Sequence, residues 1–472
     1  MRLWFLLVLA VCVPVAAQQA AEPLAGRLGA SGAQAMPDSE RQLAQSRVTG
    51  EKETVTLEEA VRLAIDRHPD VGKTRAASDV LKGKIKEVRS QALPDVKIIA
   101  DGARTRDPGL LNSSGIDKFP PELKDALLPT AVNLFDYSIS LKQPLYTAGK
   151  VGTALRLASV EAEGAVADVD RAEQDLALGV VKAYYGLLWA ERDRELVAAT
   201  QEQRKLHAEM ARTRFKNGVA TEVDVLRSEV AVANGAPELV RADNAIRQAR
   251  ALLNFYMVRP IDFPTRTSAE FPERPWEEST VDALFQEAAR GRPELHRLRI
   301  AEQSAAAMLQ LAKAENRMRV DATAGYGIVA RSPKNLIDPL YRRWSIGVNF
   351  TLPVFDGFKR NGMVEQAVAN QRAARLERER VEQQVRLGLQ QGGDDLKAAR
   401  ETISAARTNI GQAERVLSMM QANYRFGAAT TLDIVDAQTA VTVARTNLLG
   451  GLHAYAIARA NLLWTLGKRP WE

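Results

Sequence analysis

The residues best suited to chemistry in this sequence are carboxylates that follow two short glycine- and threonine-containing stretches. Asp433 and Asp436 stand one helical turn apart in the segment Tyr424–Gln438, YRFGAATTLDIVDAQ. An earlier segment, Phe215–Glu229 with the sequence FKNGVATEVDVLRSE, repeats the glycine, the threonine and, at Asp224, the first aspartate. In both segments glycine ends one helical pattern and threonine begins the next, which predicts two helical hairpins.

Capping explains part of this pattern. Asp224 and Asp433 each follow a threonine by three residues, the spacing of a capping box, and a carboxylate there also complements the helix dipole. Asp436 lies deeper in its helix, so capping does not explain it. Asp436 therefore requires a role other than capping.

Other chemically active side chains are scattered along the chain. The four histidines, His68, His207, His296 and His453, show no metal-ligand spacing. The sequence contains no nucleophile elbow, P-loop, dinucleotide fingerprint or HExxH motif. We predict that the protein is not an enzyme and has no cofactor and no metal site.

The start of the chain predicts export. An apolar run over Leu3–Val15 follows one arginine and precedes small residues, which is typical of a secretory signal and too short for a retained membrane anchor. Val11 is not small, which disfavours lipidation of Cys12, the only cysteine. We predict a signal peptide over 1–17, a flexible leader over 18–50, and a mature chain without disulfides.

Charge and hydropathy narrow the class of protein. The formal net charge of +6 is small for 472 residues, and basic and acidic residues alternate along helical stretches. This pattern predicts solvated helix faces and no nucleic acid partner. After the signal, no apolar run approaches the length of a membrane helix, whereas membrane strands leave a much weaker signal and stay possible.

Two pairs of segments change from the helical period to alternation. We predict strands over 95–106, 132–146, 319–330 and 343–355. In each pair one face is apolar and the other is small or polar. We expect the apolar face to contact lipid, and its clearest members are Phe135, Tyr137, Ile139, Leu141, Trp344, Ile346, Val348 and Phe350.

Long helical patterns follow each pair of strands. We predict helices over 149–216 and 357–425, each about 100 Å long, and shorter helices over 222–258 and 431–466. Apolar positions spaced by three and four residues predict a coiled-coil seam. In the first long helix the predicted seam is Leu176, Val180, Ala183, Leu187 and Ala190.

The same order of elements occurs twice. A capping box at Thr56 starts the first helix, with Pro69 expected to kink or split it, and Thr280 starts the matching helix later in the chain. We predict a first structural repeat over 51–260, a proline-rich linker over 261–279, a second repeat over 280–468 and a short tail over 469–472. The fold class is therefore mainly α, internally duplicated, with long antiparallel coiled-coil helices and four strands in each protomer.

Four strands cannot close a barrel, and open strand edges are not tolerated in lipid. Two copies would give about eight strands, whose interior fills with side chains, and three would give about twelve. The glycine-, serine- and threonine-rich inner face favours a wider lumen and hence three copies. We therefore expect a homotrimer with a 12-stranded membrane β-barrel and an α-helical tunnel, in which each protomer supplies about four full-length helical columns.

The sequence resembles the TolC-like outer-membrane efflux family over Val55–Lys468. The motifs that carry the resemblance are TLEEAVRLAIDRHPDV at 56–71, KQPLYTAGK at 142–150, LPVFDGFKR at 352–360 and YRFGAATTLDIVDAQTA at 424–440. The resemblance implies a passive exit duct of a tripartite efflux or type I secretion system in the outer membrane, with its helical portion in the periplasm. It implies a periplasmic adaptor (a membrane fusion protein) and an inner-membrane pump as partners, besides outer-membrane lipid.

The resemblance also implies roles at the hairpin tips. An aspartate pair at the positions of Asp433 and Asp436 rings the closed mouth in the family, and three copies would place about six carboxylates around one axis, which attracts cations. Tyr424 matches a tyrosine of the closed-state latch. The family often has an arginine where this sequence has Ala429, and here Arg425 lies nearby instead. Arg227, which stands opposite Asp436 in the alignment of the two repeats, is a candidate substitute partner.

We assign the cation ring and gate to Asp433, Asp436, Asp224, Tyr424 and Arg227, while capping alone stays open for Asp224 and Asp433. The resemblance further implies that the adaptor docks on the small tip residues, Gly218, Val219, Ala220, Thr221, Gly427, Ala428, Ala429 and Thr430. These tips also serve as plain hairpin turns.

An alternative function is a soluble periplasmic coiled-coil scaffold or adaptor. A soluble protein has no need for aromatic side chains such as Phe135 and Trp344 along one face of short strands. The predicted strands therefore favour the channel.

Overall fold

The computed structural model describes residues 53–105, 120, 131–268, 270–277 and 279–471. The predicted signal peptide, the leader and most of the loop after the first strand lie outside these residues. Two halves follow each other. The first contains β1 (Glu53–Val55), α2 (Leu57–Arg67), α3 (Pro69–Ser90), β2 (Asp95–Thr105), β3 (Val132–Tyr146), α5 (Lys150–Lys216) and α6 (Glu222–Tyr256).

The second half repeats this order after β4 (Thr265–Thr267). It contains α7 (Val281–Gly291), α8 (Pro293–Ala314), β5 (Arg319–Ala330), two 3₁₀ turns, η3 (Pro333–Ile337) and η4 (Pro339–Tyr341), then β6 (Arg342–Thr351), α9 (Lys359–Arg425) and α10 (Thr431–Thr465). Corresponding helices have equal lengths: 11 residues in α2 and α7, 22 in α3 and α8, 67 in α5 and α9, and 35 in α6 and α10.

Proline divides the first helical stretch of each half. Proline lacks a backbone N–H and disfavours helical geometry in the residue before it. At the first junction α2 ends at Arg67, α3 begins at Pro69, and the His68 imidazole between them accepts the backbone N–H of Asp70 at 3.3 Å. At the second junction α8 begins at Pro293.

The structure shortens two predicted elements. The fourth strand, predicted over 343–355, ends at Thr351, because Thr351 pairs with Arg319 at the start of β5 and Pro353 has no N–H to donate. The second long helix, predicted from 357, begins at Lys359, because Gly357 and Phe358 have left-handed backbones with φ of 63° and 67°. Other helix and strand ends differ from the predicted bounds by one or two residues.

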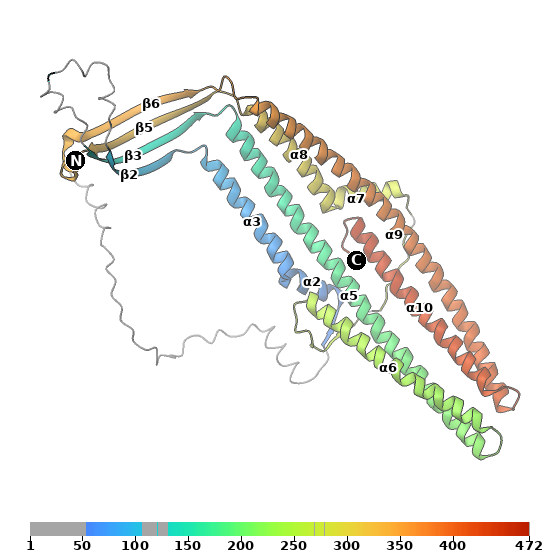
Figure 1. The fold of residues 1–472 in the computed structure, drawn as a ribbon. Helices are drawn as coiled ribbons and strands as arrows, with labels where there is room; N and C mark the ends of the chain where they lie inside the picture. Colours follow the sequence, from blue (N-terminus) through green and yellow to red (C-terminus); the bar gives the residue numbers. More distant parts are fainter. Residues whose placement is uncertain (1–52, 106–119, 121–130, 269, 278, 472) are drawn as a thin grey trace, which may run out of the picture. The chain divides into compact units, whose positions relative to one another are not determined.

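Four of the described strands form an antiparallel sheet in the order β2-β3-β5-β6 (Figure 1). The register places apolar residues of neighbouring strands opposite each other. Ile98 pairs with Ile139, Ile139 pairs with Tyr326, and Tyr326 pairs with Trp344. Because side chains alternate between faces, this single row fixes one apolar face across all four strands.

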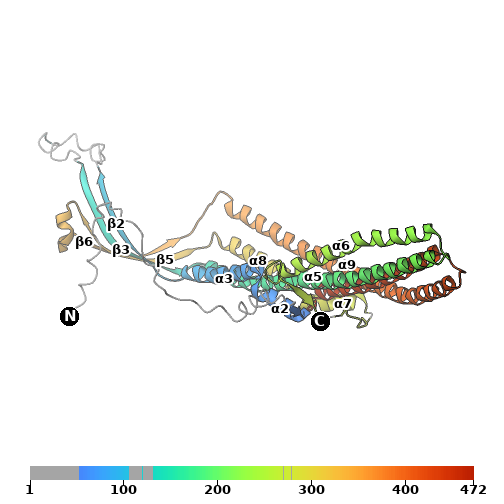
Figure 2. The same ribbon diagram turned by 90° about the horizontal axis from the view of Figure 1, so that it is seen from below.

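The helices pack in four columns. The long helix α5 packs against α3 and α6 on one side and against α8 and α10 on the other, while α9 packs against α8 and α10. The four-stranded sheet and the tips of the hairpins α5–α6 and α9–α10 lie at opposite ends of these columns (Figure 1 and Figure 2). No described helix is both long and apolar enough to cross a membrane.

The predicted seam of α5 is buried at all five positions, Leu176, Val180, Ala183, Leu187 and Ala190. Around it lies a core shared by α2, α5, α6 and α10. A second core joins α7, α8, α9 and α10. The alanines of the seam allow the helices to approach closely, as the spacing predicts.

A parallel pair of three-residue strands, β1 and β4, ties the start of the first half to the linker. The buried Tyr184 of α5 anchors this pair, since its hydroxyl donates to the Val55 carbonyl at 3.0 Å and accepts from the Ser268 N–H at 3.1 Å. Sequence analysis did not predict these strands, because three residues are too few for an alternation signal.

Candidate functional site

Both hairpin tips close with the same backbone arrangement. Gly218 and Gly427 adopt left-handed backbones with φ of 75° and 77°, which glycine reaches without steric cost. The next N–H groups, of Val219 and Ala428, return to the helix and donate to carbonyls five residues earlier, each at 2.9 Å. This is the Schellman arrangement, and it ends α5 and α9 in the same way.

Capping boxes then start α6 and α10. The carboxylate of Asp224 accepts from the Thr221 N–H at 3.0 Å and from the Thr221 hydroxyl at 2.7 Å. The carboxylate of Asp433 accepts from the corresponding groups of Thr430 at 2.7 and 2.8 Å. These hydrogen bonds favour the ionised form and lower the pKa of both carboxyl groups below the usual range. The capping interpretation of both residues is therefore confirmed.

Asp436 differs from the capping aspartates. It lies one turn further into α10, is exposed and does not take part in the capping box. Arg227, also exposed, lies near enough to Asp224 for its charge to contribute to the lowered pKa of that carboxyl. Across the described part of the chain, no salt bridge within 4.0 Å joins Arg227 to Asp436, so their pairing stays a prediction.

Tyr424 joins the two hairpins, through a partner that sequence analysis missed. Its ring is buried, and the Arg214 guanidinium of α5 lies 4.2 Å from the ring centroid. The same guanidinium donates to the Tyr424 backbone carbonyl at 2.6 Å. The Tyr424 hydroxyl lies 3.4 Å from the hydroxyl of Thr431. A single arginine from the first hairpin therefore holds the end of α9.

A second missed residue lies beside this contact. His207 of α5 is 2% exposed, and its ring centroid lies 5.7 Å from that of Tyr424. The available sequence signal was its position seven residues after Thr200, on the same buried face of a coiled-coil helix. Arg214 has no such signal, because its contact joins residues 210 positions apart in the chain.

The tip residues themselves are accessible. Of the eight predicted docking residues, Ala220 and Ala429 are half-buried and the others are exposed. Phe426 beside them is 89% exposed. The tips thus present small side chains and one large apolar side chain to the surroundings.

The sheet carries the predicted lipid-facing residues at the other end of the helices. The Ile98–Ile139–Tyr326–Trp344 row marks one face of the sheet. All eight residues lie on that face, at alternate positions of β3 and β6. Ile346 is 79% exposed and Trp344 is 75% exposed, and Phe135 is half-buried. The opposite face carries residues such as Ser138, Gly327 and Arg343.

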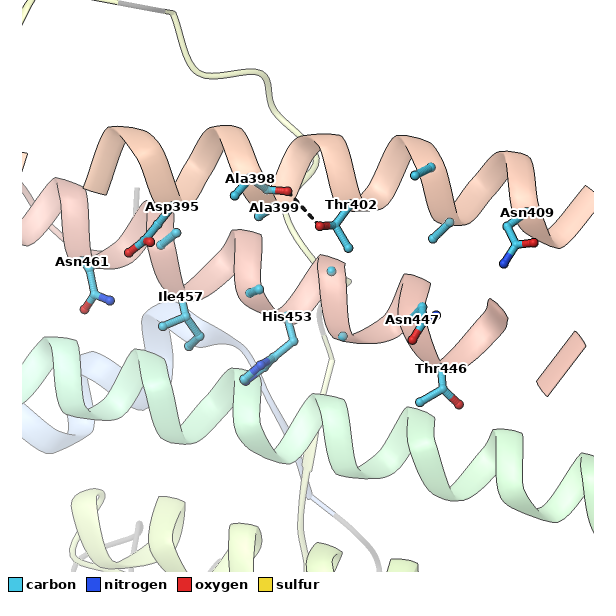
Figure 3. Close-up of a pocket in the computed structure, with 16 residues that line it drawn as sticks. Asp395, Ala398, Ala399, Thr402, Asn409, Thr446, Asn447, His453, Ile457 and Asn461 are labelled. Carbon is cyan, nitrogen blue, oxygen red and sulfur yellow. Dashed lines mark hydrogen bonds between the residues drawn. The ribbon is translucent and has the colours of Figure 1, made fainter. Parts of the chain in front are cut away.

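A groove of about 1110 Å³ runs between α9 and α10, away from the tips (Figure 3). Alanine and glycine make up half of its lining residues, and its titratable lining residues are Asp395 and His453. His453 projects toward α5, where its ring centroid lies 6.2 Å from that of Trp189 (Figure 3). One carboxylate and one imidazole do not form a catalytic constellation.

The family model described as outer membrane efflux protein matches residues 60–257 and 284–468, one segment in each half of the chain. The chain belongs to the outer membrane efflux protein family. The two matched segments of this family coincide with the two structural repeats and leave out the linker between them. The predicted resemblance to this family is confirmed.

Relatives in the outer membrane efflux protein family match most of the chain. Outer membrane protein TolC of Escherichia coli K12 is 25% identical over 419 residues, 85% of this chain and 80% of that protein. The alkaline protease secretion protein AprF of Pseudomonas aeruginosa is 22% identical over 348 residues, 70% of this chain and 69% of that protein.

Solved structures share the fold. A membrane protein from Pseudomonas aeruginosa superposes with a TM-score of 0.77 at 20% identity, covering 87% of this chain and 90% of that one. The outer membrane protein VceC from Vibrio cholerae has a TM-score of 0.74 at 20% identity, covering 87% and 96%. The predicted mainly α fold of the TolC type is thus confirmed.

Proposed function

We propose that this protein is the outer-membrane channel of an efflux or type I secretion system, a passive duct whose helical portion lies in the periplasm. Membership of the outer membrane efflux protein family supports this assignment. The observation that carries it is the exposed apolar face of the four-stranded sheet.

Exposure of this apolar face to water would cost free energy. Trp344, Ile346 and Phe350 are each more than 70% exposed, and they lie on one face of the edge strand β6. Exposed apolar patches of this kind mark surfaces that are covered in the working protein. Hydrocarbon suits a strand face of this composition, while the serine- and glycine-containing face suits a wet lumen.

The sheet edges support an assembly of several copies. The sheet order leaves β2 and β6 with unpaired edges, and lipid does not tolerate unpaired backbone groups. If β6 of one copy pairs with β2 of the next, the contact is head-to-tail and generates a ring. Three copies then close a barrel of about twelve strands. A homotrimer is our proposal.

The tips form the closed end of the proposed duct. The residues Asp433 and Asp436, with Asp224 and Arg227 on the first hairpin, would surround the axis and favour cations. Opening is then a shift in helix packing between the hairpins α5–α6 and α9–α10, which the Arg214–Tyr424 contact opposes. The small residues of the tips would receive the helical hairpin of a periplasmic adaptor, which couples the duct to an inner-membrane pump.

Two measurements on detergent-purified full-length protein test the proposal. Migration in SDS without heating should show an oligomer that dissociates into single chains on boiling. Reconstitution into planar bilayers should give single-channel currents. A soluble periplasmic scaffold gives neither result, so a monodisperse single copy in detergent-free buffer, with no channel activity, would refute the proposal.

A further inference from the structure

The contact between the two hairpins contains a buried histidine whose environment suits only its neutral form. His207 of α5 is 2% exposed, and neither ring nitrogen has a hydrogen-bond partner among the described residues. Burial lowers the pKa of this imidazole. A buried polar group without a partner is costly, and a buried charge without a partner is far more costly.

The groups that face His207 come from four helices. A small cavity of about 20 Å³ beside it is lined from α5 by Thr200 and Arg204. From α6 it is lined by Ser228 and Ala231, and from α10 by Val435, Gln438, Thr439 and Thr442. From α9 the Tyr424 ring packs against the imidazole.

These surroundings offer no counter-ion to a protonated imidazole. The one charged residue of the cavity wall is Arg204, whose guanidinium is bound to the carboxylate of Glu238 on α6 at 2.9 Å. The Tyr424 ring already faces the Arg214 guanidinium at 4.2 Å. A proton on His207 would therefore add a positive charge near Arg204, in a buried site whose cavity of about 20 Å³ has room for roughly one water molecule.

A charge on His207 would act on the contact between the two hairpins. His207 belongs to the first hairpin, and the residues it meets on α9 and α10 belong to the second. The nearby hydroxyls of Thr200 and Thr442, 3.3 Å apart, join the same two hairpins. Full hydration of a protonated imidazole requires the two hairpins to separate there, because the cavity beside it has room for roughly one water molecule.

We propose that His207 makes the closed tips sensitive to acid: protonation of its imidazole weakens the packing between hairpins α5–α6 and α9–α10 and favours the open arrangement. This inference rests on the proposed channel function. As pH falls, the open arrangement gains the proton first, because water reaches the imidazole there. The closed arrangement loses stability from about pH 6.5, the ordinary histidine pKa, downward.

The test compares single-channel recordings at about pH 7.5 and about pH 5.5, on either side of that ordinary pKa. The ratio of open to closed wild-type channels should rise by up to about tenfold for each pH unit below about 6.5 and for each histidine that gains a proton. His207→Phe keeps a ring against Tyr424 but cannot be protonated. In this variant the ratio of open to closed channels should not rise at low pH. His207→Gln serves as a second variant if the phenylalanine does not fit.

A matched control is His453→Phe. His453 is half-buried, and burial lowers its pKa as it does that of His207, but it packs against Trp189, away from the tips. This control should keep the wild-type pH response. An unchanged response in both His207 variants, or its loss in His453→Phe, would overturn the inference.

A second readout needs no ion flow. Spin labels at Lys216→Cys and Ala422→Cys report the distance between the ends of α5 and α9 in detergent. The distance distribution should broaden toward longer values at about pH 5.5 in the wild-type background and stay unchanged with His207→Phe. If channels are absent but this shift appears, the channel proposal fails and the switch stands. If channels conduct and the shift is absent, the channel proposal stands and the acid switch at His207 fails.

Discussion

At the residue scale, the two neighbouring aspartates of the last helix have separable roles. Asp433 holds the start of α10 through Thr430, and these hydrogen bonds keep its pKa low. Asp436 makes no contribution to the cap. A charge role can therefore be tested at Asp436 without disturbing the helix start.

We expect the double variant Asp433→Ala/Asp436→Ala to show higher single-channel conductance and a weaker preference for cations, because it removes two carboxylates per copy from the proposed ring. Bilayer recordings with asymmetric salt measure both quantities. Asp436→Asn alone should reproduce part of the loss of cation preference. Unchanged selectivity in both variants would leave Asp433 with the capping role alone and Asp436 with no role in the gate.

The link between the hairpins gives a second prediction at this scale. Arg214→Ala should shift the closed-to-open equilibrium by about 1–2 kcal/mol toward opening, since it removes both a cation–π contact and a charged hydrogen bond to the Tyr424 carbonyl. The open fraction in bilayers measures the shift.

Tyr424→Phe is the matched control for that prediction. It keeps the ring and the backbone carbonyl that Arg214 contacts, and loses only the hydroxyl, 3.4 Å from Thr431. Its open fraction should stay near the wild-type value. An effect as large as that of Arg214→Ala would place the latch at the hydroxyl instead.

These residues also mark the limit of sequence-based prediction. The capping partners Thr430 and Asp433 were predictable, because a capping box is local in the chain. The pairing of Arg214 with Tyr424 was not, because it depends on how two separate hairpins pack. The sequence pointed instead to Arg227 as a partner of Asp436, and that pairing stays a prediction.

At the element scale, the sheet depends on glycine in β5. Gly327 faces Ser138 on one side and Arg343 on the other, and a Cβ added to it would lie 2.5 Å from the Ser138 Cβ. The absence of a side chain there lets the Arg343 guanidinium reach across β5 to the carboxylate of Asp136 on β3.

Gly327→Ala should therefore destabilise the sheet by about 1–3 kcal/mol, the usual cost of overpacking. The midpoint for heat dissociation of the oligomer should fall. Gly347→Ala on the next strand is the control, because its added Cβ would approach no heavy atom more closely than the Thr323 hydroxyl oxygen at 3.5 Å. Equal midpoints for the two variants would contradict the packing argument.

The elements themselves were largely predictable. Strict alternation indicated all four strands of the sheet, and the period of the helices indicated the hairpins, because both patterns come from one buried or lipid-exposed face. The exceptions have local causes: left-handed backbone at Phe358 delays α9, and the strands β1 and β4 exist only because Tyr184 brings their backbones together.

At the scale of the whole molecule, the helix α5 joins the two regions that the function needs. It runs without a break from the end of the sheet to the first tip over 67 residues, about 100 Å at the usual rise. In such a duct each chain has one part in lipid and another in water. The channel assignment therefore depends on whether lipid covers the apolar face of the sheet.

Neighbouring residues of β6 allow a direct test of this assignment, since Ser345 and Ile346 point to opposite faces. Ile346→Arg would place a charge on the face we assign to lipid, at a cost of about 2–4 kcal/mol near the bilayer midplane. We expect this variant to lose the membrane-inserted oligomer, measured as the heat-dissociable band in outer-membrane fractions.

Ser345→Arg carries the same change onto the face we assign to the lumen, where water solvates the guanidinium. We expect it to assemble normally and to alter single-channel conductance instead. A soluble scaffold predicts that both variants are tolerated, because Ser345 and Ile346 are both exposed and an arginine at Ile346 would remove apolar surface from water. The ranking of these two variants thus decides between lipid and water as the medium around the apolar face.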